Sequence, residues 1–196
     1  LNNLAMLYLH QGLYAKAEPL LQSSLAIKEK ALGPKSPKTA NTLSNLGTLR
    51  YYQGLYSKAE ALHQRSIAVY EKAIDSDPKS LAFSYNNLAL TYEKQGLFSK
   101  AETFHQRSLA IRENALGPEH PSTATSLNNL AALMFAQGFY TKAEPLYQRA
   151  LAITEQALGP EHPDTATTLS NLALVYFNQQ LFAKAEPLDQ RVLAIR

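Results

Sequence analysis

The chain of 196 residues contains no cysteine and no tryptophan, and only 18% of its residues are charged. Without cysteine it can form neither a disulfide framework nor a thiolate metal site, which fits a reducing compartment. So low a charge content, beside 45% hydrophobic residues, excludes an intrinsically disordered chain. The composition therefore predicts an ordered fold with ample apolar material for a core.

Long runs of one residue class are also missing. The formal net charge is +3, but the 19 Lys and Arg residues are scattered and form no basic run, so we do not expect a nucleic-acid partner. No apolar stretch approaches the ~20 residues needed to cross a bilayer, and no signal peptide opens the sequence. We therefore expect a cytoplasmic protein that has no membrane partner.

The sequence does contain a repeat of 42 residues, seen most completely in 122–163. Gly12, Gly54, Gly96 and Gly138 recur at this interval, with Gln180 in the fifth place, and the interval also relates five Ala-Glu pairs and five asparagines. Matches at several independent columns do not arise from composition. Because both ends fall inside predicted helices, we expect a segment of a longer array. The predicted organisation is a single array of five repeats: 1–37 (partial), 38–79, 80–121, 122–163 and 164–196 (partial).

Each repeat is predicted to form two helices. In 122–163 the apolar spacing predicts a first helix over about 122–137 and a second that runs to about Leu158. Gly138 supplies the left-handed residue after the first helix, and Gly159 ends the second. The residues expected to be buried are Ala124, Leu127, Leu130, Ala131 and Met134 on the first helix, and Ala143, Leu146, Ala150, Ile153 and Ala157 on the second.

Local signals predict how the second helix begins. Thr141 and Glu144 have the spacing of a capping box, which Ser57 with Glu60 and Ser99 with Glu102 repeat. Pro145 is expected close to the first turn, where a missing N–H costs least.

Three departures from the repeat carry expectations of their own. Arg50 occupies a column of Tyr and Met residues, so we expect its guanidinium to extend to solvent. Gln180 replaces glycine, and a left-handed backbone there would cost ~1–2 kcal/mol. Residues 74–78 replace the Gly-Pro turn at constant length, and this turn is expected to differ in conformation.

The pattern Leu127-Asn-Asn-Leu-Ala131, Gln137-Gly-Phe-Tyr140 and Leu158-Gly-Pro-Glu-His-Pro163 resembles the tetratricopeptide repeat. More narrowly, it is similar to the 42-residue form of kinesin light chains and their bacterial relatives, whereas the ordinary period is 34. The resemblance implies an all-α fold, an α-solenoid of stacked antiparallel helix pairs wound into a right-handed superhelix. The sequence departs from the general pattern by using Leu for the tryptophan and by lacking its closing proline.

The candidate binding face lies on the first helix of each repeat, roughly opposite its buried stripe. By resemblance it lines the concave groove in which kinesin light chains bind short cargo peptides. Its asparagine column would offer amides to an extended peptide backbone. Alternatively, the same amides bond neighbouring helices and hold the superhelical pitch. The candidate peptide-binding residues are Asn3, Asn45, Asn87, Asn129, Asn171, Asn41, Phe83, Thr125, Tyr52 and Lys94.

The chemistry of the predicted ligand follows from the sparse charge of this face. His10 and Lys94 are the only candidate cations in its last column, and lysines are missing one turn before the asparagines. A carboxylate clamp for chaperone tails is therefore excluded. We expect a mixed apolar and polar peptide of a partner protein, bound with an affinity on the order of micromolar.

No pattern in the sequence favours catalysis, a cofactor or a metal. His63 and His105 are one repeat apart, but no third ligand recurs with them, and we interpret them as surface residues. The sequence has no Gly-rich phosphate loop, nucleophile elbow or His-Glu-x-x-His motif. The alternative to a binding scaffold is a structural element that forms a homo-oligomer, stacking end to end through its uncapped terminal helices.

Overall fold

The computed structural model describes residues 1–73 and 77–195. Within these residues the chain forms ten α-helices and no strand. We call the first helix of each repeat an A helix (α1, α3, α5, α7, α9) and the second a B helix (α2, α4, α6, α8, α10). The helices are α1 (Asn2–His10), α2 (Tyr14–Leu32), α3 (Pro37–Tyr52), α4 (Tyr56–Tyr70), α5 (Pro78–Lys94), α6 (Phe98–Leu116), α7 (Pro121–Ala136), α8 (Tyr140–Leu158), α9 (Pro163–Asn178) and α10 (Phe182–Ile195).

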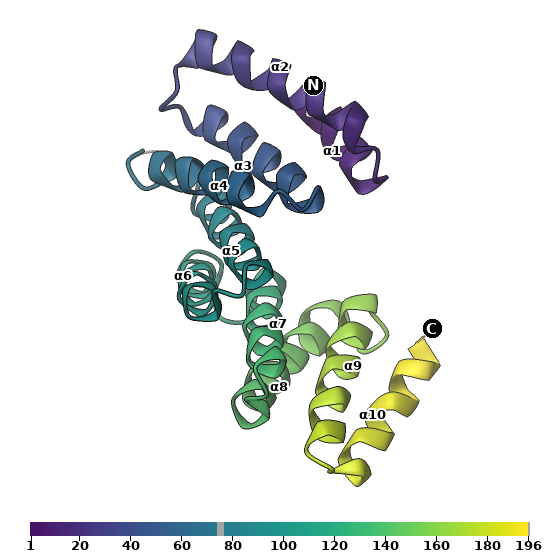
Figure 1. Cartoon of the computed structure of the whole chain (residues 1–196). Coiled ribbons are helices and arrows are strands. Elements are labelled where there is room, and N and C mark those ends of the chain that lie inside the picture. Colours follow the sequence, from purple (N-terminus) through teal and green to yellow (C-terminus); the bar gives the residue numbers. More distant parts are fainter. Residues whose placement is uncertain (74–76, 196) are drawn as a thin grey trace. The chain divides into compact units, whose positions relative to one another are not determined.

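The chain divides into two compact units, Leu1–Phe104 and His105–Arg196. In the first unit, α1 to α5 each pack against the next helix, and the A helices α1, α3 and α5 also contact one another in turn (Figure 1). In the second unit, α7 to α10 do the same, with α7 against α9. Each unit is thus a stack of antiparallel helix pairs, which confirms the predicted all-α solenoid architecture.

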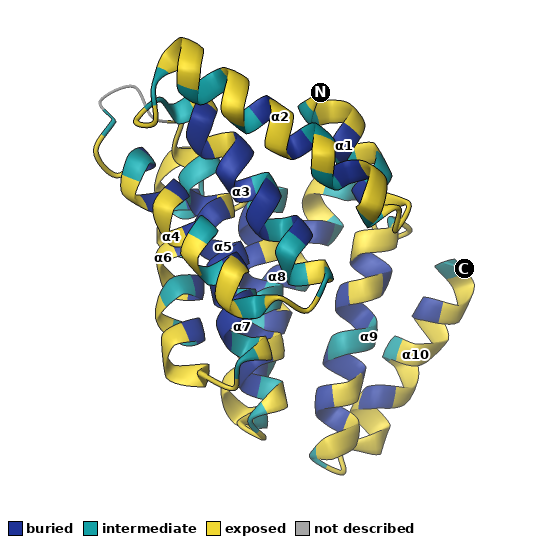
Figure 2. Ribbon diagram, turned by 45° about the horizontal axis from the view of Figure 1, so that its top comes forward, coloured by how far each residue is buried: buried dark blue, intermediate teal, exposed yellow. Residues whose placement is uncertain are grey.

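The core of each unit lies between A and B helices and is built from small and branched apolar residues (Figure 2). All five residues predicted to be buried on 122–137 are buried. On α8 the prediction holds for Ala143, Ala150 and Ile153, and Leu146 is half-buried, but Ala157 is exposed. Thr154, three residues earlier in α8, is buried instead. No described helix is long and apolar enough to span a bilayer.

The turns between A and B helices follow the glycine column. Gly138 has φ +78°, and Gln180 at the same column has φ +62°. A Cβ added at Gly138 would meet nothing within 4 Å, so the side chain of Gln180 is tolerated sterically and its cost lies in the backbone conformation. The predicted left-handed conformation of Gln180 is confirmed.

The turns from B to A helices end in side-chain caps that the sequence analysis did not identify. Nδ1 of His120 accepts from the Ser122 N–H at 3.0 Å, and Nδ1 of His162 accepts from the Asp164 N–H at 3.1 Å. Asp77 caps α5 likewise, directly before the first proline of the helix, although it stands one residue earlier in the repeat. The histidine before each proline is therefore a helix cap. The predicted difference at 74–78 concerns residues 74–76, which lie outside the described residues.

The predicted capping boxes are wrong. Helix α8 begins at Tyr140 with Phe139 as its N-cap, so Thr141 lies inside the helix and makes no cap. Ser57 and Ser99 likewise lie inside α4 and α6. Pro145 is the sixth residue of α8 and so lies in its second turn, beyond the first.

The glutamates assigned to those boxes instead bond the next repeat. Glu60 on α4 accepts from the Gln95 side chain at the end of α5, at 3.0 Å. The bond recurs from Glu18 to Gln53 at 3.2 Å and from Glu144 to Gln179 at 3.4 Å, always 35 residues apart. These bonds tie each B helix to the following A helix.

Arg50 takes part in one of these ties and does not extend to solvent as predicted. Its side chain is 15% exposed, and its guanidinium lies 2.7 Å from the Glu18 carboxylate and 2.7 Å from Oε1 of Gln53. These bonds from Arg50 and Gln53 hold the pKa of Glu18 below its ordinary value. The guanidinium stays inside because a carboxylate of the preceding repeat is within reach.

Candidate functional site

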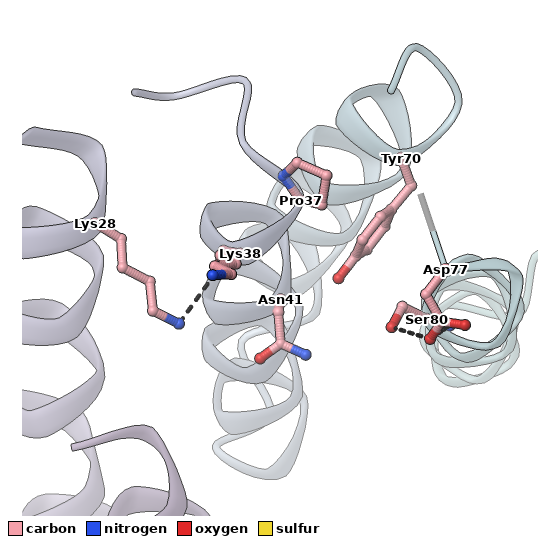
Figure 3. A pocket seen from close by; sticks show the side chains of 7 residues that line it. All are labelled: Lys28, Pro37, Lys38, Asn41, Tyr70, Asp77 and Ser80. Carbon is pink, nitrogen blue, oxygen red and sulfur yellow. Dashed lines mark hydrogen bonds between the residues drawn. The ribbon is translucent and has the colours of Figure 1, made fainter. Parts of the chain in front are cut away.

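Two hollows lie between consecutive A helices, one in each unit. The first-unit hollow, of about 270 Å³, lies between α3 and α5 and is lined by Lys28, Pro37, Lys38, Asn41, Tyr70, Asp77 and Ser80 (Figure 3). The second-unit hollow, of about 230 Å³, lies between α7 and α9 and is lined by Pro121, Thr125, Asn128, Asn129, Ala132, Thr154, Asp164, Thr167 and Asn171.

The two hollows are built at the same columns of the repeat. Four residues of the second hollow each lie two repeats after a residue of the first. The matched pairs are Pro37 with Pro121, Asn41 with Thr125, Tyr70 with Thr154, and Ser80 with Asp164. The hollow is therefore a product of the repeat, and its lining changes from copy to copy.

The structure brings several predicted site residues to these hollows. Thr125, Asn129 and Asn171 line the second-unit hollow together, and Asn41 lines the first. Tyr52 and Asn87 line a smaller hollow of about 40 Å³, with Thr48, Tyr51, His63 and Leu90. The remaining four are not gathered at these hollows: Asn45 is half-buried on α3, and Asn3, Phe83 and Lys94 are exposed on α1 and α5.

Asn87 supports the structural interpretation of its column. Its side chain is only 8% exposed, and Nδ2 donates to Oγ1 of Thr48 at 3.2 Å. The bond joins α5 to α3, so this amide holds two consecutive A helices together. Asn129 and Asn171, in contrast, border a hollow large enough to admit a ligand group.

A second asparagine column, one residue earlier in the repeat, also bonds consecutive A helices. The sequence patterns above did not predict it. Asn2 Nδ2 donates to Oγ1 of Thr42 at 3.2 Å, and Asn128 Nδ2 donates to Oγ1 of Thr168 at 2.9 Å. Both partners lie 40 residues on, in the next A helix. Three repeats contain an Asn-Asn pair. This pair was the feature of the sequence that could have indicated two adjacent asparagine columns, of which the first bonds the next A helix.

The floor of the hollows comes from the B helices, which the sequence analysis did not consider. One column supplies Lys28 and Tyr70 to the first-unit hollow and Thr154 to the second-unit hollow, and Arg112 occupies the same column on α6. Tyr70 and Thr154 are each 3% exposed, and the Tyr70 hydroxyl points toward the space between Asn41 and Ser80 (Figure 3). Burial raises the pKa of Tyr70.

The cations of this column lie on B helices and add to His10 and Lys94, the candidates in the last column of the A-helix face. Lys28 Nζ donates to the Lys38 carbonyl at 3.1 Å, and Arg112 Nη1 donates to the Ser122 carbonyl at 2.7 Å. Burial lowers the pKa of both, and the charge of Lys38 lowers that of Lys28 further. Each unit therefore has a cation that reaches an A helix from a B helix.

His63 and His105 are fully buried, which corrects their interpretation as surface residues. Neither ring nitrogen of His63 has a hydrogen-bond partner among the described residues, and burial lowers its pKa to about 4. The ring fits because a Cβ at Gly47 would lie only 2.7 Å from Cε1 of His63. His63 is therefore an uncharged part of the core near pH 7.

Comparison with known proteins places this geometry in a family. The model of the tetratricopeptide repeat matches residues 1–72, 80–138 and 126–196. A search of curated proteins finds no match. Among solved structures, the chain is similar to a Podospora anserina protein described as a kinesin light chain with nearly identical TPR-like repeats. The identity is 27% and the TM-score 0.81, over 99% of this chain and 92% of that one.

Two further structures share the fold. BtubC (BKLC) from P. vanneervenii has 26% identity and a TM-score of 0.80, over 93% of this chain and 72% of that one. RapI has a TM-score of 0.84 at 15% identity, over 99% of this chain and 68% of that one, which shows likeness of fold alone. With nearly every described helix inside a family match, the chain belongs to the tetratricopeptide repeat family, in its kinesin light chain-like form.

Proposed function

We propose that the chain is a non-catalytic scaffold whose A-helix face binds an extended peptide of a partner protein. The supporting observation is the hollow that recurs at the same columns between α3 and α5 and between α7 and α9. A repeated recess along consecutive A helices suits a ligand that is itself repetitive, as an extended peptide backbone is.

The lining chemistry suits a peptide backbone. The second-unit hollow offers the hydroxyls of Thr125 and Thr154 and the amides of Asn129 and Asn171. Hydroxyls and amides can each donate and accept, which the alternating N–H and C=O groups of a peptide require. The resemblance to kinesin light chains implies the same face and the same class of ligand.

The two hollows differ in charge, so the peptide is expected to be mixed in character. The first-unit hollow carries Lys28 and Lys38 with a single carboxylate, Asp77. The second-unit hollow has Asp164 as its one charged residue. A donor or cationic side chain is favoured at the second hollow, and an acceptor or acidic one at the first.

A peptide-library pulldown followed by titration of the selected peptide tests the proposal. The double variant Thr125→Ala with Asn171→Ala should weaken binding at least tenfold while the helical circular dichroism persists. Asn114→Ala, on an exposed position of α6, is the matched control and should bind as the parent does. Undiminished affinity in the double variant would remove the second-unit hollow from the binding site.

Self-association is a second candidate function, because exposed apolar side chains gather on α9 and α10. Leu174, Phe177 and Phe182 are each more than half exposed, and the two Phe rings stack edge to face at 5.4 Å. Such side chains on a surface favour a protein contact. Light scattering over a range of protein concentrations separates the two functions, because a monomer that binds peptide contradicts the assembly role.

A further inference from the structure

The first unit has a larger hollow of about 490 Å³ that shares no residue with those between A helices. It lies between the connection that follows α2 and the C-terminal half of α4. Its lining consists of Pro34, Lys35, Arg65, Ala68, Val69, Lys72 and Ala73. Three of these residues are cations and none is a carboxylate.

Only one of the three cations is neutralised by a described residue. Arg65 pairs with Glu29 of the preceding repeat at 2.5 Å. The same pairing joins Arg149 to Glu113 and Arg191 to Glu155, so Arg65 belongs to the repeat framework. Lys35 and Lys72 are exposed, and no ion pair is found for them in the part of the chain that the structure describes. Among the described residues, the hollow therefore has two positive charges without an ion-pair partner.

The two lysines distinguish this place in the array from the same columns of later repeats. At the column of Lys35, later Gly-Pro turns carry Glu119 and Glu161, so the charge there is reversed. At the column of Lys72, later repeats carry Asn114 and Gln156. The framework accepts acidic residues at the first column and neutral residues at the second, so folding does not require the lysines.

The floor of the hollow is aliphatic. Val69 and Ala73 are half-buried and Ala68 is exposed, which gives an apolar surface between two charged rims. A lone phosphate would leave this floor uncovered, and a flat bilayer cannot enter a recess. We propose that the hollow binds an acidic segment of a partner protein, in which carboxylates flank an aliphatic residue that contacts Val69.

Fluorescence anisotropy with a labelled, capped Asp-Glu-Leu-Glu-Asp peptide tests this site directly. The acidic probe should bind at least tenfold more tightly than its amide analogue Asn-Gln-Leu-Gln-Asn. Affinity should fall between 50 and 200 mM salt, because exposed charges are screened over about a Debye length. Equal binding of the two probes would overturn the proposal.

Residues borrowed from the other repeats provide matched variants. The double variant Lys35→Glu with Lys72→Asn should lower the affinity for the acidic probe at least tenfold. It should leave the thermal midpoint nearly unchanged. The reciprocal pair, Glu119→Lys with Gln156→Lys, lies two repeats later and should add a second equivalent of probe in calorimetry. Unchanged affinity in the first double variant refutes the site, whatever the second shows.

Two further controls distinguish this site from the A-helix face and from a membrane-binding surface. The variant Lys38→Gln should bind the acidic probe normally, since its change lies in the first-unit hollow, where the A-helix face favours an acidic side chain. Loss of probe binding in that variant would instead assign the acidic segment to the A-helix face. The protein can also be sedimented with phosphatidylserine vesicles. If it co-sediments with the vesicles but does not bind the acidic probe, the ligand is an anionic membrane and the proposal is overturned.

Discussion

His63, buried in α4 against Gly47, should make the stability of the protein depend on pH, and His63→Leu should abolish that dependence. One repeat earlier, Leu21 occupies the same column and is fully buried. The framework therefore accepts leucine at this place. At pH 7 the substitution should also stabilise the fold by up to about 1–3 kcal/mol, because it removes a buried imidazole N–H that lacks an acceptor.

The size of the pH effect follows from the pKa of His63. Burial lowers it from 6.5 to about 4. Between these values the unfolded chain binds a proton that the folded chain excludes, so the free energy of unfolding decreases as pH falls through this window. At 1.36 kcal/mol per pKa unit the full loss is about 3 kcal/mol by pH 4, of which about 2 kcal/mol is lost between pH 7 and pH 5.

Urea unfolding monitored by circular dichroism at pH 7, 6 and 5 measures this directly. The stability of the leucine variant minus that of the parent should grow by about 2 kcal/mol from pH 7 to pH 5. The other histidines are common to both proteins and largely cancel in the difference. Parallel stability curves for the two proteins would refute the reasoning, and His10→Gln, at an exposed residue, controls for loss of a histidine as such.

Three further predictions concern turns, caps and ties. Gln180→Gly should raise the thermal midpoint by about 2–8 °C and Gly138→Gln should lower it, since a left-handed residue other than glycine costs ~1–2 kcal/mol; equal midpoints would mean that the backbone there is unstrained. His162→Ala should destabilise by about 1 kcal/mol in urea unfolding, whereas His162→Asp should not, because Asp77 caps α5 from the same N-cap position before a proline. The pKa of Glu18 is lowered by Arg50, so the parent should lose stability as pH falls below 4.5, and Glu18→Gln should flatten this acid limb; an unaltered limb in urea midpoints from pH 6 to 3 would contradict that.

The sequence predicted what depends on nearby residues. The helix of 122–137, its buried stripe and the left-handed Gln180 follow from spacing and backbone sterics within one repeat. Ala157 was misplaced because burial near the end of α8 depends on which neighbouring helices reach it.

The errors concern contacts between repeats. Glu144 has the spacing of a capping box, yet it accepts from Gln179, which lies 35 residues away. Arg50 had a carboxylate within reach only because α2 packs on α3. Tyr70 belongs to a B helix, yet its hydroxyl points into the hollow between two A helices. This position depends on how far the B helix is shifted along its axis relative to the neighbouring A helices. The 42-residue pattern in the sequence does not specify this shift between neighbouring helices.

The ties between repeats keep constant spacings of 35, 36 and 40 residues along the chain. Duplicating or excising one whole 42-residue segment would therefore leave each of these three kinds of bond with a donor and an acceptor. An insertion or deletion of any other number of residues would leave a glutamate, an arginine and an asparagine at the junction without their hydrogen-bond partners. The protein can therefore be lengthened or shortened only by whole repeats, and each repeat added or removed changes the number of hollows between A helices.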